Sequence, residues 1–255
     1  MNDASPPRRP APRELLVTAR HQLTPNMLRV TLGGAGLAGF PADAKGGYIK
    51  LNLPVDGGKS VIRTYTIAAQ RADELDCDFA LHGLTGTGHA GPATQWAMDA
   101  EPGDIVLVGG PGPAQPLPPG RSFYLMVGDM TALPAIAVNL AELPADARGV
   151  AVIEVMNEDD RQPLPKPDGV ALKWVICPQP GSNPAALADK VRAITLPEGG
   201  FAWAACEFSA MQRLRADLRG ERGLGPDALY ISSYWKSGLT EEAHKVAKRE
   251  DAMAA

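Results

Sequence analysis

The stretch PGPAQPLPPG, residues 111–120, separates two parts of the chain that follow different sequence patterns. Five of its ten residues are proline. Proline lacks an amide hydrogen and fixes φ, so a stretch this rich in proline continues neither a helix nor a central strand. We therefore interpret it as a linker, and we place the boundary between two domains near residue 118.

On the N-terminal side of the linker, apolar and more polar residues alternate. In GGYIKLNLP, residues 46–54, Ile49, Leu51 and Leu53 are separated by single residues, and CDFALH, residues 77–82, alternates in the same way. Alternation with a period of two predicts a strand with one buried face. Such segments, separated by Gly, Pro and Asn, predict a six-stranded antiparallel β-barrel in residues 13–118, with strands near 15–21, 27–32, 47–53, 62–69, 76–82 and 104–109.

On the C-terminal side, continuous apolar runs alternate with helical patterns. SFYLMVG, residues 122–128, leads through GDMTALP into a segment with one apolar helical face. Runs of this kind are typical of strands that are buried on both sides. Three more follow, VAVIEV, LKWVIC and FAWAAC, and together they predict a doubly wound parallel sheet with helices in residues 119–232. Residues 233–255 are expected to form a short helical tail.

Composition excludes several classes of protein. The net charge is −4 and aromatic residues make up 5% of the chain, which argues against a nucleic-acid-binding surface. The three cysteines are far apart and suggest neither a disulfide framework nor a metal site. No run of 18 apolar residues predicts a membrane span. We expect a cytoplasmic monomer without a membrane association, preceded by a disordered leader in residues 1–12.

The stretch GTGHAG, residues 86–91, matches the dinucleotide fingerprint G-x-G-x-x-G. A βαβ crossover needs at least ten to twelve residues, and the two turns of helix before Pro102 are too few for one. The pattern therefore does not predict a Rossmann unit. A short helix that begins at Gly91 still offers free amides and a positive dipole to an anion. The alternative is a flexible hairpin turn.

RTYTIAAQ, residues 63–70, carries a second candidate site. On a strand, Arg63 and Tyr65 share one face, and Thr64 and Thr66 share the other. A guanidinium binds phosphate with two parallel hydrogen bonds, and an aromatic ring packs beside a planar ligand such as a flavin. The alternative is a surface arginine next to a packed tyrosine.

Four segments together resemble the siderophore-interacting protein family, which are FAD-containing, NAD(P)H-dependent ferric-siderophore reductases within the ferredoxin-reductase-like superfamily. The segments are RTYT at 63–66, GPATQWA at 91–97, GDMTALPAIA at 128–137 and SYWKSGLTEE at 233–242. The resemblance implies an FAD-binding barrel in residues 13–118 and an NAD(P)H-binding domain in residues 119–232. It also implies that the tail, residues 233–255, closes over the flavin and substrate pocket.

The resemblance assigns residues to each ligand, and it implies electron transfer by the flavin without a protein acid or base and without a metal. For FAD, the implied residues are Arg63, Thr64, Tyr65, Thr66, His82, Gly91, Ala93, Thr94 and Trp235. For NADH or NADPH, they are Asp129, Thr131, Ala132, Leu133, Cys206 and Glu207. For an anionic ferric siderophore, they are Lys50 and Lys236.

Three positions depart from the family pattern: Ala68 and Gly112 stand where basic residues are common, and Cys206 stands where glycine is common. The donor stays open: acidic residues at 154, 159 and 160 favour NADH, Arg161 favours NADPH, and a ferredoxin is a further candidate. The alternative functions are a general NAD(P)H:flavin or ferredoxin-type reductase and a non-catalytic flavin or chelate carrier.

Overall fold

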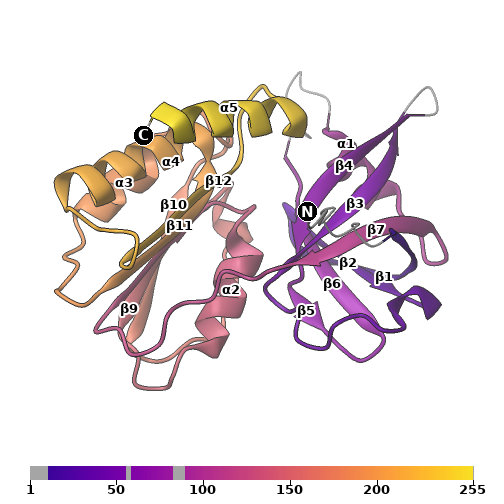
Figure 1. The fold of residues 1–255 in the computed structure, drawn as a ribbon, viewed down its shortest axis with the longest axis horizontal. Helices are drawn as coiled ribbons and strands as arrows, with labels where there is room; N and C mark the ends of the chain where they lie inside the picture. Colours follow the sequence, from indigo (N-terminus) through magenta and orange to yellow (C-terminus); the bar gives the residue numbers. More distant parts are fainter. Residues whose placement is uncertain (1–10, 56–58, 83–89, 255) are drawn as a thin grey trace, which may run out of the picture.

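The computed structural model describes residues 11–55, 59–82 and 90–254, which form two domains side by side (Figure 1). The first ten residues of the predicted leader lie outside the described part of the chain, as do Gly86 and Gly88 of the glycine-rich stretch. Ala11 and Pro12 are exposed and precede the first strand.

The first domain is an antiparallel sheet that curls around its own core, with strand order β4-β3-β7-β1-β2-β6-β5. All six predicted strands are present. The seventh, β5, has only two residues, too few to produce a periodic pattern. The elements are β1 (Arg13–Thr24), β2 (Met27–Gly33), η1 (Ala35–Leu37), β3 (Tyr48–Val55), β4 (Lys59–Thr66), β5 (Ala69–Gln70), β6 (Glu74–Ala80), α1 (Pro92–Asp99) and β7 (Ile105–Gly112).

The alternation in the sequence corresponds to the inner and outer faces of this sheet. Ile49, Leu51 and Leu53 are fully buried, and so are Cys77 and Phe79 on β6. Their neighbours along β3 are partly exposed. The predicted core of the first domain is therefore confirmed.

The second domain is a five-stranded parallel sheet with strand order β10-β9-β8-β11-β12. Helix α2 packs on one face, and α3 and α4 pack on the other, which confirms the doubly wound arrangement. The elements are β8 (Tyr124–Gly128), α2 (Leu133–Glu142), β9 (Gly149–Val155), η3 (Glu158–Asp160), β10 (Val170–Ile176), α3 (Ala186–Arg192), β11 (Phe201–Glu207), α4 (Phe208–Arg215), the π-helical turn η4 (Ala216–Glu221), β12 (Leu229–Trp235) and α5 (Glu241–Ala254).

The linker begins later than the prolines suggest. Strand β7 continues to Gly112, which pairs with Tyr48 of β3, so the first two residues of the predicted linker belong to the sheet. A proline is compatible with a strand end, where a ladder hydrogen bond is not required. The regular structure resumes only at β8.

The two domains share an apolar interface. Met27 of β2 and Ala80 of β6 belong to the same buried cluster as Met126 and Met130 of the second domain. Lys45 also forms an ion pair with Glu142 at the end of α2, with 2.9 Å between Nζ and Oε1. The second domain therefore packs against strands of the first and is not merely tethered to it.

Phe79 is predicted to be a main support of the first domain. Its ring is fully buried and lies 4.0 Å from that of Tyr65 and 5.7 Å from that of Trp96, measured between ring centroids. Replacing it by alanine leaves a cavity, so Phe79→Ala should lower the free energy of unfolding by about 3–5 kcal/mol in urea denaturation. Ile105→Ala, a change at a side chain that is 63% exposed, should lower it by less than about 1 kcal/mol. Equal losses would contradict this assignment of the core.

Candidate active site

A pocket lies between the two domains, at the carboxyl ends of the parallel strands. The first domain contributes the end of β6, and the second contributes the ends of β8, β9, β10 and β12. In open α/β sheets, ligands bind at this edge. The side chains that give the pocket its chemical character are His82, Asp129, Thr131, Glu154, Cys177 and Trp235.

Asp129 joins the ends of three strands. Its Oδ1 accepts hydrogen bonds from the amide of Thr131 (2.9 Å) and from the Thr131 hydroxyl (2.6 Å). Its Oδ2 accepts from the amide of Glu207 on β11 (2.8 Å) and from the indole N–H of Trp235 on β12 (2.8 Å). Burial raises the pKa of Asp129, and the hydrogen bonds from Thr131 and Trp235 oppose that shift.

Trp235 and His82 meet face to face across the domain boundary. Between β11 and β12 the pairing changes register, from Cys206 opposite Ser233 to Glu207 opposite Trp235. The extra residue is a β-bulge, a feature that redirects the next side chain. The indole lies 5.6 Å from the imidazole of His82, with 11° between the ring planes. Burial lowers the pKa of His82, with the charge of Asp129 acting in the opposite direction, so His82 is neutral at pH 7.

The start of α2 differs from the predicted nucleotide site. The family resemblance assigns Thr131, Ala132 and Leu133, at this helix start, to the nicotinamide nucleotide, and free amides there would bind its phosphates. Instead, the amides of Ala132 and Leu133 both donate to the carbonyl of Asp129 (3.0 Å each), while that of Thr131 donates to the Asp129 carboxylate. Ala132 and Leu133 are also buried. Of the predicted group, only Asp129 and Thr131 line the pocket.

Cys206 and Glu207 are likewise buried inside the second domain. The Cys206 side chain is fully buried in the cluster that packs beneath α3 and α4, and burial raises the pKa of its thiol. The carboxylate of Glu207 caps α4 by accepting from the amides of Ser209 (2.5 Å) and Ala210 (3.2 Å). Neither side chain lines the pocket.

Cys177, which the sequence reasoning did not select, lines the pocket in their place. It follows β10, and Glu154 lies near the end of β9. The sequence could have identified both residues, because each stands at or next to the end of a predicted parallel strand, and these strand ends meet at one edge of the sheet.

The four residues of the RTYT segment lie on β4, as predicted. Tyr65 packs on Phe79 in the core, and burial raises the pKa of its phenol. Arg63 is on the same face and lies 3.6 Å from a carboxylate oxygen of Glu242 on α5. Thr64 donates to Glu241, also on α5 (3.1 Å). Thr66 is half-buried at the end of the strand.

The second predicted FAD segment begins α1. Gly91 is the N-cap, and a Cβ added there would meet nothing within 4 Å, so the space beside it is open. Ala93 and Thr94 are buried, which leaves their backbone amides as the groups they offer. Amides in the first helical turn lack an acceptor within the helix. Trp96, Phe79 and Tyr65 pack in a row and join α1 to β4.

These two segments fit an FAD cofactor. Open space, free amides and a guanidinium suit a pyrophosphate. The residues that would hold it are Arg63 and the first turn of α1, with Tyr65 and Thr66 on the same strand as Arg63. His82 and Trp235, the other residues predicted for FAD, line the pocket between the domains.

The two lysines assigned to the substrate have different surroundings. Lys50 pairs with Thr64 across β3 and β4, so both side chains point to the same face, next to the start of α5. Lys236 lies over the ring of Phe208, with 4.2 Å between Nζ and the ring centroid. Lys236 therefore contacts α4, whereas Lys50 is on the first domain.

Gly112 has a structural reason to lack a side chain. A Cβ at this position would come within 2.0 Å of the ring of Tyr48, which lies directly over the glycine. A basic residue here would require the ring to move. Ala68, another departure from the family pattern, donates its amide to Asp76 (2.8 Å) and adds no charge.

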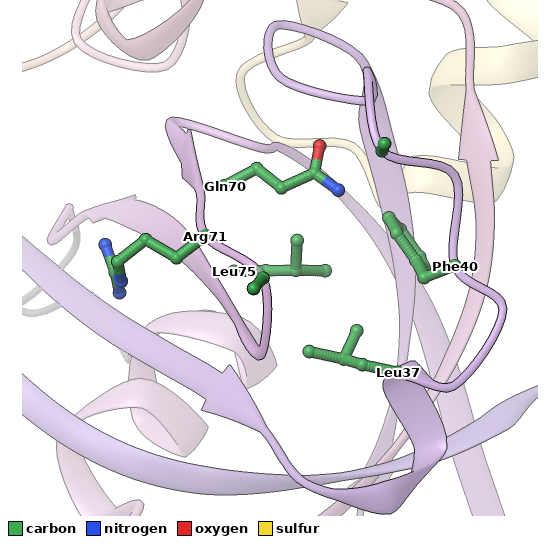
Figure 2. A pocket seen from close by; sticks show the side chains of 7 residues that line it. Leu37, Phe40, Gln70, Arg71 and Leu75 are labelled. Atoms are coloured by element: carbon green, nitrogen blue, oxygen red, sulfur yellow. The ribbon is translucent and has the colours of Figure 1, made fainter.

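A second hollow lies on the first domain, away from this pocket (Figure 2). Leu37, Phe40 and Leu75 form its apolar part, with Gln70 and Arg71 among the lining residues. The amide group of Gln70 already bonds the backbone at residues 41 and 44, and Arg71 bonds the carboxylate of Asp76. None of the predicted site residues lines this hollow, and its polar groups are engaged.

Two further expectations concern metals and membranes. Among the described residues, no three His, Cys, Asp or Glu side chains are arranged to hold a metal ion. No helix in the same part of the chain has both the length and the apolar character needed to cross a bilayer.

Comparisons with known proteins match both domains. A model described as the siderophore-interacting FAD-binding domain matches residues 16–61 and 55–115, and one described as siderophore-interacting protein matches residues 122–238. The ferric vibriobactin reductase of Vibrio cholerae is 34% identical over 91% of this chain and 92% of its own length. The NADPH-dependent ferric-chelate reductase of Escherichia coli is 24% identical over 88% of this chain and 92% of its own.

Solved structures agree with these matches. The siderophore-interacting protein SipS from Aeromonas hydrophila superimposes with a TM-score of 0.82, at 34% identity, over 96% of this chain and 99% of that one. The ferredoxin–NADP⁺ reductase of Plasmodium falciparum has a TM-score of 0.65 at 11% identity, over 88% of this chain and 96% of that one, and shows the shared fold.

The match to an FAD-binding domain and the 34% identity to a ferric reductase indicate a flavin-dependent oxidoreductase, and its two-domain fold is that of ferredoxin–NADP⁺ reductase. Within that class, the chain belongs to the siderophore-interacting protein family. The predicted fold and the predicted FAD cofactor are confirmed.

Glu154 should make stability depend on pH. Burial and the charge of Asp129 raise the pKa of Glu154 from 4.5 to about 7. Between these values the folded state binds the proton more tightly than the unfolded state, so stability falls as pH rises. The free energy of unfolding of Glu154→Gln, relative to wild type, should therefore increase by up to about 3 kcal/mol between pH 4.5 and pH 8 in urea denaturation.

The exposed Glu198 provides the control for this measurement. The difference between Glu198→Gln and wild type should be the same at both pH values. A difference for Glu154→Gln that is also constant would contradict the raised pKa.

Proposed function

We propose that the protein is a ferric-siderophore reductase that passes electrons from NADH or NADPH through FAD to Fe(III), and so releases Fe(II). The observation that carries the proposal is the pocket in which His82 of the FAD-binding domain faces Asp129 and Trp235 of the second domain. A pocket shared by the two domains brings a flavin on one side close to a nucleotide on the other.

The similarity to named reductases supports the substrate class. Relatives at 34% and 24% identity are named as a ferric vibriobactin reductase and a ferric-chelate reductase. Siderophores hold Fe(III) with hard oxygen donors, and lowering the charge on the metal weakens that binding. A flavin supplies the chemistry that such a reaction needs, because it accepts a hydride and passes on single electrons.

The chain's own residues would bind and orient the ligands. Arg63 and the amides at the start of α1 would hold the pyrophosphate of FAD, and Tyr65 would limit the position of its ring. Asp129 and Thr131 would contact the nicotinamide half of the donor. Lys50, on the same face as Thr64, would attract an anionic chelate.

The residues after β9 bear on the choice of donor. The carboxylate of Glu154 lines the pocket and favours an uncharged ribose over a ribose phosphate, hence NADH. Asp160 is fully buried and bonded elsewhere, so it does not contribute to this preference. Arg161 is paired with Glu158, with 2.5 Å between the charged groups. A ferredoxin as donor stays a prediction.

The tail would close over the flavin pocket. Helix α5 is fixed to the second domain by the ion pair between Arg215 and Asp251 (2.6 Å) and by His244, which bonds Ser233 (2.9 Å). Its first turn reaches β4 of the other domain, where Glu241 and Glu242 contact the RTYT segment (Figure 1). The tail thus contacts both domains and lies beside the RTYT segment.

The proposal includes the cytoplasm as the site of the reaction and a monomer as the active form. The three cysteines are free and buried, in agreement with a reducing compartment.

The decisive experiment is an anaerobic titration of the FAD-loaded protein with NADH and with NADPH, followed by a ferric siderophore and a ferrous chelator. The expected result is bleaching of the flavin by the nucleotide, then reoxidation with formation of the ferrous complex. Bleaching without faster reoxidation by any siderophore would indicate a general flavin reductase. A flavin that neither nucleotide bleaches would indicate a carrier.

Glu242 should weaken FAD binding, because its carboxylate competes with a flavin phosphate for Arg63. An exposed ion pair of this kind contributes up to about 1 kcal/mol, so Glu242→Gln should lower the Kd for FAD by about twofold to fivefold in a flavin fluorescence titration. Glu250→Gln changes an exposed residue farther along the same helix and should leave the Kd unchanged. An equal or weaker affinity in Glu242→Gln would count against the competition.

Lys50→Ala should slow the reaction with an anionic ferric chelate. Loss of the cation reduces electrostatic attraction, so kcat/KM should fall by roughly twofold to fivefold at low salt and depend less on ionic strength. Lys190→Ala, an exposed change on α3, is the matched control and should behave like wild type. If the two variants give the same salt dependence, Lys50 does not attract the substrate.

A further inference from the structure

Asp160 links the two domains through a fully buried carboxylate. Its Oδ1 accepts hydrogen bonds from the hydroxyl of Thr24 (2.8 Å) and the amide of Asn26 (2.9 Å). Its Oδ2 accepts from the side chain of Asn26 (2.8 Å) and from the amide of Asn157 (3.1 Å). Thr24 ends β1 and Asn26 lies in the turn between β1 and β2, whereas Asp160 and Asn157 follow β9.

The residues that bond Asp160 are also connected to both walls of the pocket. The carbonyl of Asn26 accepts from the amide of Leu81 (2.9 Å), and the next residue is His82. On the other side, Asn157 directly follows Met156, which lines the pocket together with Glu154. Asp160 therefore holds the wall that carries His82 and the wall that carries Met156 at once.

Among the contacts between the domains, the ion pair of Lys45 with Glu142 and the contacts of Glu241 and Glu242 with β4 involve exposed side chains, whereas Asp160 is fully buried. Met27 and Ala80 contribute apolar contacts, which favour association but do not fix orientation. Interfaces between domains of one chain commonly permit relative motion. Three of the four hydrogen bonds to this buried carboxylate cross between the domains and restrict that motion, because a buried charge that loses its donors is unfavourable.

We propose that Asp160 is a positioning residue that sets the gap between His82 and Met156, and through it the separation of a flavin on the first domain from a nucleotide on the second. The inference rests on the proposed function for its ligands, although the gap itself is a property of the protein alone. Hydride transfer requires the reacting atoms to lie about 3–3.5 Å apart, and an error of about 1 Å slows such reactions by roughly 100-fold.

Asp160→Asn tests the proposal with little change in volume. In one orientation its NH₂ group faces the backbone amide of Asn26, and in the other it faces the side-chain NH₂ of Asn26. Two donors cannot bond each other, so either orientation removes at least one of the three hydrogen bonds between the segments. The apolar interface remains, so the domains should stay associated with a wider gap.

The first measurement is an NMR titration of His82 in the protein without added flavin. Burial now lowers the pKa of His82, and Asp129, also in the pocket, opposes the shift. Water that enters a wider gap should raise the pKa of His82 towards the ordinary value of about 6.5. The substitution leaves Asp129 and Glu154 in place, and controls that do not alter the gap should leave the pKa of His82 unchanged.

The second measurement is stopped-flow reduction of the FAD-loaded protein by NADH or NADPH. The rate should fall by about tenfold to 100-fold in Asp160→Asn. The Kd for FAD should change by less than about twofold, because β4 and α1 both lie within the first domain. A combined loss of FAD binding and rate would assign Asp160 to general stability and overturn the proposal.

Asp217→Asn and Asp76→Asn are the matched controls. Asp217 is buried and bonds Arg222 within the second domain (3.0 Å), and Asp76 is buried and bonds Thr31 within the first (2.8 Å). Both should lower stability without moving the pKa of His82. If either moves it as far as Asp160→Asn does, the positioning role is wrong.

Thr24→Val provides a milder variant if Asp160→Asn does not fold. It removes one of the four donors and should shift the pKa of His82 in the same direction by a smaller amount. An unchanged pKa in the folded variant overturns the proposal. If the wild-type protein binds no FAD or is reduced by neither nucleotide, the proposed function fails, whereas the titration of His82 still tests the role of Asp160.

Discussion

The arrangement of the pocket depends on the buried carboxylate of Asp129. Its two oxygens accept four hydrogen bonds, from groups that follow β8, end β11 and end β12. Burying an anion is unfavourable unless donors surround it, so these segments must come together wherever Asp129 is charged. The indole of Trp235 is held as a consequence, and through its stack on His82 the second domain meets the first.

The two domains were predictable because their patterns are local. Alternation at Ile49, Leu51 and Leu53 and the continuous run in residues 122–128 each depend on neighbours within a few residues. Strand β5 has only two residues and no pattern to detect. The linker was placed two residues early because a proline at the end of β7 does not interrupt its pairing.

The site was harder to predict, since its hydrogen bonds join residues far apart in the chain. The sequence identified GDMTALP as a helix start but not the return of the Asp129 carboxylate onto Thr131 or its bond to Trp235. The same holds for Asp160, which a sequence reading assigns to a ribose, although it bonds a turn that precedes it by more than a hundred residues. Cys206 was predicted to contact the nucleotide because it lies at the end of a strand. The structure shows that its thiol points to the face of the sheet covered by α3 and α4, which follows from the register of β11.

The occupied amides at the start of α2 have a consequence for the direction in which a ligand enters. A helix start usually attracts phosphate, but here the carboxylate of Asp129 accepts from Thr131, and the backbone carbonyl of Asp129 accepts from Ala132 and Leu133. Glu154 also lines the pocket. The inner end of the pocket is therefore repulsive to anions and receptive to neutral or cationic rings. We expect a nucleotide that binds here to insert its reduced ring, which is uncharged, and to keep its phosphates outside. After oxidation the ring carries a positive charge, and the same carboxylates then face a cation.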